Sequence, residues 1–382
     1  MNILIAGDFF ISDDFRNKEI IDQTVIDLFQ KADYRMVNLE APITDNKPKN
    51  KILKTGPHLR MSEDTIIPYL KRLRVDGVTL ANNHILDYGA IGLVDTFNSL
   101  TKNQIKYVGA GNNLAEASKP LSIEKEGMKI AILNFCENEW SIARKDSPGA
   151  NPMDIIDNTK LIKTAKATHD KVICIIHGGH EYYNLPSPRM QKQYSFYVDN
   201  GADAIVGHHT HCISGFEIYK NAPILYSIGN FIFTLNSKKE DWYTGLLVRL
   251  RIDDKKETIK IELMPVVQEN KTFQTSLARN EIKKEIINEV ELLSEIIDKE
   301  DQLAEGWRKF INHMLTNSLN NLSLINSIKN RYVRVALRKL GINKVLLNKS
   351  FLKLIFIIMR CESHSELTIS AITKKIRNKA VE

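Results

Sequence analysis

The chain has 382 residues, of which 43% are hydrophobic and 26% are charged, and its formal net charge at pH 7 is +7. These values are typical of a folded globular protein, and they exclude a disordered or fibrous chain. No apolar run is as long as a membrane-spanning helix, and the four cysteines are too scattered for a disulfide framework or a thiolate metal site. The first predicted strand begins at Asn2 and leaves no room for a signal peptide, so we expect a cytoplasmic protein.

Five short apolar runs each end next to a polar residue of a type that binds metal ions. In chain order these residues are Asp8, Glu40, Asn83, His177 and His209. Short β-branched runs are typical of buried parallel strands, and ligand sites of open α/β sheets form at the carboxyl ends of such strands. Polar residues often follow strands because loops are polar, but five ends with only nitrogen and oxygen ligand types favour a metal site.

Helix-like segments alternate with these runs, which predicts an α/β fold. Between residues 213 and 251, strand-like segments follow one another with little helix between them, as in one antiparallel layer of a sandwich. The predicted helices cover residues 18–31, 62–73, 90–102, 158–168 and 187–200.

The last hundred residues have a different pattern, which is helical and then basic. Ile282, Ile286, Val290 and Leu293 recur every three or four residues and predict an amphipathic helix. After residue 328, nine lysines and arginines up to Arg360 have only two acids nearby. We therefore expect a domain of residues 1–270 and a basic helical extension of residues 275–382. The extension is expected either to pack on the domain or a partner subunit, or to bind the inner membrane face.

Six groups of residues form an ordered series of motifs over residues 1 to about 265. They are Gly7-Asp8, Asn38-Leu39-Glu40, Ala81-Asn82-Asn83-His84 with Asp87-Tyr88-Gly89, His177-Gly178-Gly179 with Glu181-Tyr182, Gly207-His208-His209 with His211, and Tyr226-Ser227-Ile228-Gly229-Asn230-Phe231. The series resembles the CapA family of capsule and poly-γ-glutamate synthesis proteins, a branch of the calcineurin-like metallophosphoesterases. Each motif alone is weak, but the ordered set is specific. The resemblance implies a four-layer α/β (α+β) fold, in which a β-sandwich is flanked by helices, with a divalent metal site at the sheet edge.

The resemblance also implies roles for the residues at the strand ends. His84 would be the general acid, because a histidine can supply a proton near neutral pH, and Asp87 would orient it. In an extended segment, His209 and His211 would point to one side and His208 to the other, away from the metal. One or two divalent ions (Mn, Fe or Zn) would be held by Asp8, Glu40, Asn83, His177, His209 and His211.

Two positions depart from the wider metallophosphoesterase pattern. Phe10 stands where that pattern has a histidine two residues after the first aspartate, and Glu40 stands where it has an aspartate. Phe10 removes one ligand, so one metal would bind weakly or the site would be mononuclear. The CapA branch shares both features, which implies altered chemistry rather than lost function.

Further residues near these motifs are candidates for binding the substrate. Lys54, His58 and Arg60 lie in a basic, turn-rich segment that is equally compatible with ordinary surface charge. His180 and Glu181 are equally compatible with hydrogen bonds within their loop. The candidates are Lys54, His58, Arg60, His180, Glu181 and Asn230.

The sequence therefore predicts a metal-dependent hydrolase of the CapA type. Its substrate would be a phosphoester or a γ-glutamyl bond of an anionic polymer in capsule or surface polymer synthesis, and the residues do not choose between these bonds. The alternative is a non-catalytic accessory protein of a membrane-associated synthesis complex, attached through the C-terminal extension. No nucleic-acid partner is expected.

Overall fold

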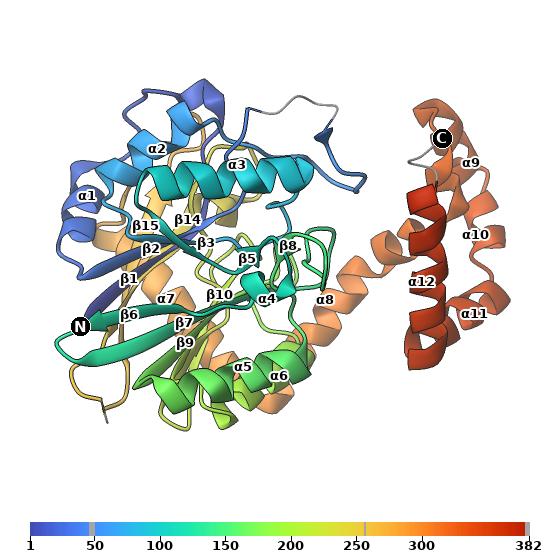
Figure 1. Cartoon of the computed structure of the whole chain (residues 1–382). Helices are drawn as coiled ribbons and strands as arrows, with labels where there is room; N and C mark the ends of the chain where they lie inside the picture. The colour runs from blue at the N-terminus through green and yellow to red at the C-terminus, as the bar shows by residue number, and fades with distance from the viewer. Residues whose placement is uncertain (46–49, 256, 379–382) are drawn as a thin grey trace. The chain divides into compact units, whose positions relative to one another are not determined.

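The computed structural model describes residues 1–45, 50–255 and 257–378 (Figure 1). Contacts within the chain divide it into two compact units, Met1–Trp307 (the first unit) and Arg308–Glu382 (the second unit).

Eight strands form one sheet of the first unit. β1, β2, β3 and β4 are parallel neighbours in that order, and β13 also pairs with β1 in parallel. On the other side of β1, β14, β15 and β16 continue the sheet with antiparallel pairing. The strands are β1 (Asn2–Phe10), β2 (Tyr34–Leu39), β3 (Gly77–Thr79), β4 (Lys106–Val108), β13 (Asn230–Phe233), β14 (Thr244–Arg251), β15 (Lys260–Gln268) and β16 (Thr275–Leu277).

A second sheet has six strands in the order β11-β12-β10-β9-β7-β6. Its four inner strands are parallel, and β6 and β11 are antiparallel edges. The strands are β6 (Leu121–Lys125), β7 (Met128–Cys136), β9 (Lys171–His177), β10 (Ala204–His208), β11 (Phe216–Tyr219) and β12 (Ala222–Leu225). The short strands β5 (Ala110–Gly111) and β8 (Gly149–Ala150) pair separately.

The two sheets pack face to face, and helices cover their outer faces (Figure 1). Ile5 and Met36 of the first sheet belong to the same buried core as Ile132, Ile175 and Val206 of the second. The near-continuous apolar sequences of β1, β9 and β10 follow from this arrangement, because strands covered on both faces bury all their side chains. The fold is thus the expected four-layer α/β sandwich.

The five predicted helices are confirmed, with shifts at some ends. α1 (Gln23–Gln30), α2 (Glu63–Arg72) and α3 (Gly89–Lys102) lie on the first sheet, and α5 (Ile155–Thr168) and α6 (Pro188–Asp199) lie on the second (Figure 1). A one-turn helix, α4 (Leu114–Ala117), precedes β6. The prediction for α1 began five residues too early, because Asp22 is the N-cap and accepts a hydrogen bond from the Thr24 amide. α5 begins three residues earlier than predicted, because Asp154 caps it in the same way.

β16 and α7 (Asn280–Ile297) lie beyond residue 270 but belong to the first unit. Their place follows from the apolar stripe of α7, which is buried at Ile286, Val290, Leu293 and Ile297. Whether residues 1–270 fold without them stays a prediction.

The second unit consists of helices. α8 (Glu300–Asn321) begins in the first unit, and α9 (Arg331–Lys339), α10 (Ile342–Leu346), α11 (Lys349–Arg360) and α12 (Glu362–Asn378) follow. No residue of α9 or α11 is buried. Among the residues that the structure describes, no helix has both the length and the apolarity needed to cross a bilayer.

Candidate metal centre

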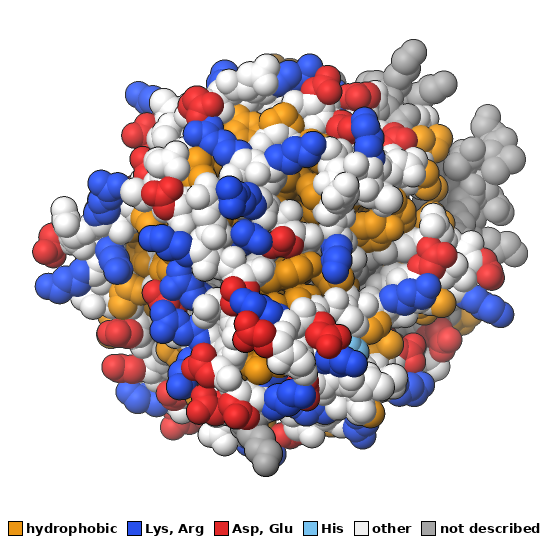
Figure 2. All heavy atoms as spheres, turned by 60° about the vertical axis from the view of Figure 1, so that its left-hand side comes forward, with side chains coloured by type: hydrophobic (Ala, Val, Ile, Leu, Met, Phe, Trp, Pro, Cys, Tyr) orange, Lys and Arg blue, Asp and Glu red, His pale blue; other side chains and the backbone are white. Residues whose placement is uncertain are grey.

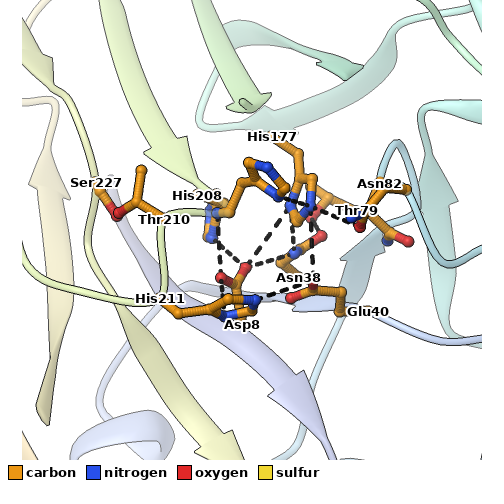
Figure 3. A network of polar contacts seen from close by, with 12 residues as sticks. Asp8, Asn38, Glu40, Thr79, Asn82, His177, His208, Thr210, His211 and Ser227 are labelled. Carbon is orange, nitrogen blue, oxygen red and sulfur yellow. Dashed lines mark hydrogen bonds and ion pairs between the residues drawn. The ribbon is translucent and has the colours of Figure 1, made fainter. Parts of the chain in front are cut away.

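The predicted ligands come together where strands of the two sheets end (Figure 3). Asp8 lies near the end of β1 at a shift in the strand register, and Glu40 directly follows β2. His177 is the last residue of β9, and the His209 segment follows β10. Asp8 and Glu40 are fully buried, and the other predicted ligands are each at most 9% exposed. The polar residues that the sequence analysis placed at the carboxyl ends of strands therefore do lie together as a buried cluster.

Glu40, Asn83, His177 and His209 form the first ligand group. His177 Nε2 lies 3.6 Å from Glu40 Oε1, 3.1 Å from His209 Nδ1 and 3.2 Å from Asn83 Oδ1. Ligand atoms about 2.0–2.2 Å from one ion lie about 3–3.6 Å from each other in tetrahedral or octahedral geometry. The three distances from His177 Nε2 are thus compatible with donor atoms that share a single divalent ion.

Asp8, Glu40 and His211 form the second ligand group, in which the three donor atoms lie within 4.8 Å of one another. His211 Nδ1 lies 3.4 Å from Asp8 Oδ2, and His211 Nε2 lies 3.7 Å from Glu40 Oε1. Glu40 belongs to both groups. Its carboxylate is therefore placed between two candidate ion positions.

The carboxylate of Glu40 also tests whether a cation fits here. Both of its oxygens are buried and have no hydrogen-bond partner. Burial raises the pKa of Glu40 well above its usual value, and the nearby Asp8 raises it further. A buried carboxylate without donors is costly, and a bound cation would offset that cost. The donor set therefore fits a metal site.

Two histidines of the cluster, His177 and His209, have lowered pKa values, which favour their neutral forms. Burial, followed by the neighbouring His209, lowers the pKa of His177 well below its usual value. Burial and His211 lower the pKa of His209 to about 3. Burial alone would raise the pKa of Asp8, but His208 and His177 together hold it below its usual range. Neutral imidazoles beside an ionised carboxylate are the protonation states that metal ligands need.

His211 is oriented by Asn230, which β13 places beside β1 in register with Asp8. The Asn230 amide donates to the Trp242 carbonyl at 3.0 Å, and its oxygen lies 2.9 Å from His211 Nδ1. His211 Nδ1–H then donates a hydrogen bond to the Asn230 oxygen, which leaves Nε2 free to bind a cation. These contacts place Asn230 behind a candidate metal ligand, and its predicted contact with the substrate stays a prediction.

Asn38 lies between the two ligand groups and was not predicted as a site residue. Its amide nitrogen donates to Asp8 Oδ1 at 2.6 Å and lies 3.1 Å from His177 Nδ1, while Thr79 donates to its oxygen at 3.1 Å. The signal was present, because Asn38 begins the motif that contains Glu40.

The prediction that His208 points away from the metal ligands is wrong. His208 is buried, and its Nδ1 lies 3.3 Å from Asp8 Oδ1 (Figure 3). The prediction assumed an extended segment, but His209 and His211 have φ angles of 92° and 55°. These left-handed conformations end the alternation of side chains, so His208, His209 and His211 all approach Asp8 or Glu40.

His84 and Asp87 form a hydrogen-bonded pair next to Asn83. Asp87 Oδ2 lies 2.7 Å from His84 Nδ1 and also accepts from the Leu59 amide at 2.7 Å. Lys54 forms an ion pair with Asp87, its Nζ lies 3.1 Å from His84 Nδ1, and its side chain is 3% exposed. Burial lowers the pKa of His84, Asp87 raises it and Lys54 lowers it. Lys54 thus contacts both members of the predicted acid pair, and its predicted contact with the substrate stays a prediction.

Residues 2–235 match the family described as "Bacterial capsule synthesis protein PGA_cap". The chain belongs to this family. "PGA biosynthesis protein CapA" of Bacillus subtilis is 35% identical over 221 residues, which are 57% of this chain and 58% of that protein. "Capsule biosynthesis protein CapA" of Bacillus anthracis is 32% identical over 288 residues, 72% of this chain and 68% of that protein. A "probable polyglutamine synthesis accessory protein" of Mycobacterium tuberculosis is 31% identical over 220 residues, 53% of this chain and 56% of that protein. The chain thus spans less than two thirds of two of these relatives.

The part of the chain that matches the capsule synthesis family contains both ligand groups, His84 and Asp87. It also contains Phe10, whose ring packs against Phe233 with centroids 5.3 Å apart. A phenylalanine has no ligand atom, so Phe10 cannot supply the further ligand that the wider metallophosphoesterase pattern has at this position.

The remaining predicted substrate residues are more scattered. His58 Nε2 lies 2.7 Å from the Ile52 carbonyl in its own loop, and Arg60 forms an ion pair at 3.2 Å with Asp13, which lies in the segment after β1. The His180 ring lies edge-on to Trp307, with centroids 5.0 Å apart. Glu181 is exposed, but it is close enough to raise the pKa of Glu40. Of the four, Glu181 has the clearest electrostatic link to the ligands.

Two further side chains near the ligands were missed. Glu139 Oε1 lies 3.9 Å from His209 Nε2, and the Trp242 ring lies 4.6 Å from the His211 ring. Glu139 follows β7, so the rule that located the ligands at strand ends also applies to it. Nothing in the sequence spacing indicates Trp242.

Proposed function

We propose that this chain is a divalent-metal-dependent hydrolase that cleaves a phosphoester or γ-glutamyl bond of an anionic polymer in capsule or poly-γ-glutamate synthesis. Glu40 carries the proposal, because a fully buried carboxylate without a hydrogen-bond donor is shared by two groups of metal-type ligands. Membership of the capsule synthesis family supports the polymer context.

We further propose two ions with unequal affinities. The first ligand group offers two imidazoles, an amide and a carboxylate, which suit Zn²⁺, Fe²⁺ or Mn²⁺. The second group offers Asp8, Glu40 and His211, and Phe10 stands where the wider metallophosphoesterase pattern has a further histidine. The ion in the second group should therefore dissociate first.

Divalent cations at these positions would polarise a substrate oxygen and lower the pKa of a nearby water molecule. His84 would donate the proton that the leaving group requires. Asp87 holds His84 Nδ1, so Nε2 is the atom that would transfer the proton. Burial and Lys54 lower the pKa of His84 and Asp87 raises it, and the net lowering would make the protonated imidazole a stronger acid. This arrangement serves an alkoxide leaving group and an amine leaving group equally.

The test combines metal analysis with turnover. The purified chain should contain divalent metal and should hydrolyse either a nitrophenyl phosphodiester or a γ-glutamyl anilide. His177→Ala should lower both metal content and turnover. The control His169→Ala should change neither, because His169 lies outside the cluster and is hydrogen-bonded to Ser122. Unchanged metal content in His177→Ala would refute the ligand assignment.

The second candidate is a non-catalytic accessory role in polymer synthesis. Phe10 favours it, and so do Glu139 and Glu181, because carboxylates near the ligands repel an anionic substrate. The name of the Mycobacterium tuberculosis relative points the same way. A chain that binds metal through these residues but cleaves neither type of bond would support this role over the hydrolase.

A further inference from the structure

The positive charge of the chain is concentrated in the second unit. Residues 308–382 contain fifteen lysines and arginines and three acids, a net charge of +12. Since the whole chain carries +7, residues 1–307 carry −5. On the face shown in Figure 2, basic and acidic side chains are intermixed. The second unit therefore has a large net positive charge, whereas the first unit has a smaller net negative charge.

Large apolar side chains are exposed in the same unit. Tyr332 and Leu340 on α9 are 84% and 75% exposed, and Phe356 and Met359 on α11 are 59% and 70% exposed. Exposed apolar surface of this extent usually marks a site of interaction.

The two kinds of side chain are ordered along α11. Lys349, Lys353 and Arg360 are four and eleven residues apart, so they lie within about 40° of one another around the helix axis. Phe356 and Ile357 lie on the two sides of this basic stripe, and the Arg360 guanidinium lies 5.6 Å from the centroid of the Phe356 ring. The helix thus presents a row of cations flanked by exposed apolar side chains.

α9 has a related pattern. Arg331, Arg334 and Arg338 share one side of the helix, and Val333 and Leu340 lie on the opposite side, where they remain exposed. A helix that lies in a membrane interface combines these features, because its apolar side chains enter the acyl region while lysines and arginines reach the headgroups.

We propose that the second unit binds the surface of an anionic lipid bilayer through α9 and α11. Charge complementarity selects an anionic surface. The apolar side chains favour lipid over nucleic acid, because most of those exposed on α9 and α11, such as Val333, Leu354 and Ile357, cannot stack on bases, whereas they partition into acyl chains. The proposed binding residues belong to the second unit and the candidate metal ligands to the first, so the proposal does not depend on hydrolysis.

The test uses the full-length chain with vesicles of phosphatidylglycerol and phosphatidylcholine, and with vesicles of phosphatidylcholine alone. Flotation should show binding to the anionic vesicles only, and high salt should weaken it. The triple variant Lys349→Glu, Lys353→Glu, Arg360→Glu should bind at least about tenfold more weakly. The matched control, Lys145→Glu, Lys163→Glu, Lys284→Glu, makes the same charge change on exposed positions of the first unit and should bind within about twofold of the unchanged chain.

A second variant tests the apolar part. Phe356→Ser with Ile357→Ser leaves the charge unchanged and should remove the binding that persists at high salt. Metal content should be the same in all variants, which separates this test from that of the hydrolase. The proposal is overturned if the unchanged chain ignores anionic vesicles at low salt, or if the control loses as much binding as the triple variant. It is also overturned if the same residues mediate self-association in the absence of lipid. Binding of oligonucleotides that the Phe356→Ser, Ile357→Ser variant leaves unchanged would overturn it as well.

Discussion

The two units place their charged side chains in opposite ways. In the first unit, Asp8, Glu40 and His177 are buried and face one another at the strand ends. In the second unit, basic side chains lie at the surface beside exposed apolar ones such as Phe356. Burying a charge is costly without a compensating group, and large exposed apolar patches mark binding sites. The comparison teaches that each unit is suited to a different partner, a small cation in the first and a broad anionic surface in the second.

The largest expected effect concerns how far along the chain the first unit extends. A chain ending at residue 275 should be severely destabilised, because it lacks α7 and the buried side chains of Ile286, Val290, Leu293 and Ile297. Each fully buried side chain of this kind contributes about 1.5–3 kcal/mol, and the sum approaches the whole stability of a typical domain. A chain ending at Trp307 keeps α7 and should unfold at a much higher temperature in circular dichroism. Equal melting temperatures would instead place the end of the domain near residue 270, as the sequence suggested.

The next effect separates catalysis from metal binding within the first unit. His84→Ala should keep its metal but lose about 10²–10⁴-fold in turnover, the usual contribution of a general acid. The loss should be smallest for substrates with good leaving groups, such as nitrophenyl esters. Steady-state kinetics on nitrophenyl and alkyl esters, with metal analysis of the same samples, measures both quantities. Loss of metal, or an equal loss of rate on both esters, would contradict the acid role.

Glu40→Gln should weaken both ions, because Glu40 belongs to both ligand groups. We expect metal affinity to fall by more than about 100-fold at each position, exceeding the loss typical of residues that only support a ligand. His209→Ala should affect mainly the first group and His211→Ala mainly the second. Equilibrium dialysis with elemental analysis gives the stoichiometry, and the control is Glu262→Gln, a half-buried glutamate on β15 that pairs with Arg249 and Arg251. Two ions retained in Glu40→Gln would rule out the shared position.

Acid should destabilise the metal-free protein. His209 has a pKa of about 3 when folded, below the value of about 6.5 expected when unfolded, so the unfolded state binds the proton more tightly. Stability is therefore full above about pH 6.5 and is lost as the pH falls toward 3. His209 alone should contribute about 2 kcal/mol of loss between pH 7 and pH 5. Urea unfolding at both pH values measures it, and His209→Gln should reduce the dependence on pH; an unchanged dependence would speak against a neutral buried histidine.

The smallest effect should come from the residue that orients a ligand. Asn230→Ala removes the acceptor for His211 Nδ1 and should weaken the second ion by about tenfold while leaving the first unchanged. Competition with a fluorescent chelator resolves a change of this size. If both ions weaken alike, Asn230 supports the local fold rather than one ligand.

The strands, the helices and the positions of the candidate ligands could be predicted from the sequence, because each depends on a local pattern of residues. β-branched runs at Ile3 or Val172 can be buried only as central strands, and the residues after them must lie at one sheet edge. The four-layer arrangement itself came from the resemblance of ordered motifs rather than from periodicity.

Other features depend on contacts that no spacing encodes. The approach of His208 to Asp8 requires left-handed backbone at His209 and His211, which residues with a Cβ adopt only where the surrounding structure holds them. Lys54 reaches Asp87 because a loop folds back over the site, more than thirty residues away along the chain. The apolar stripe of α7 was visible in the sequence, but its periodicity did not say which surface it covers.

The shared carboxylate has a consequence for how the metal centre would fill. Because the pKa of Glu40 is raised, the carboxyl group retains a proton at higher pH than an ordinary glutamate. A cation that binds there must displace that proton, so metal uptake is also proton release. The heat of binding in a calorimeter would then vary with the ionisation enthalpy of the buffer, and an acidic medium would slow loading without any change in the ligands. Since both ligand groups use the same carboxylate, the first cation to arrive would release the proton for both.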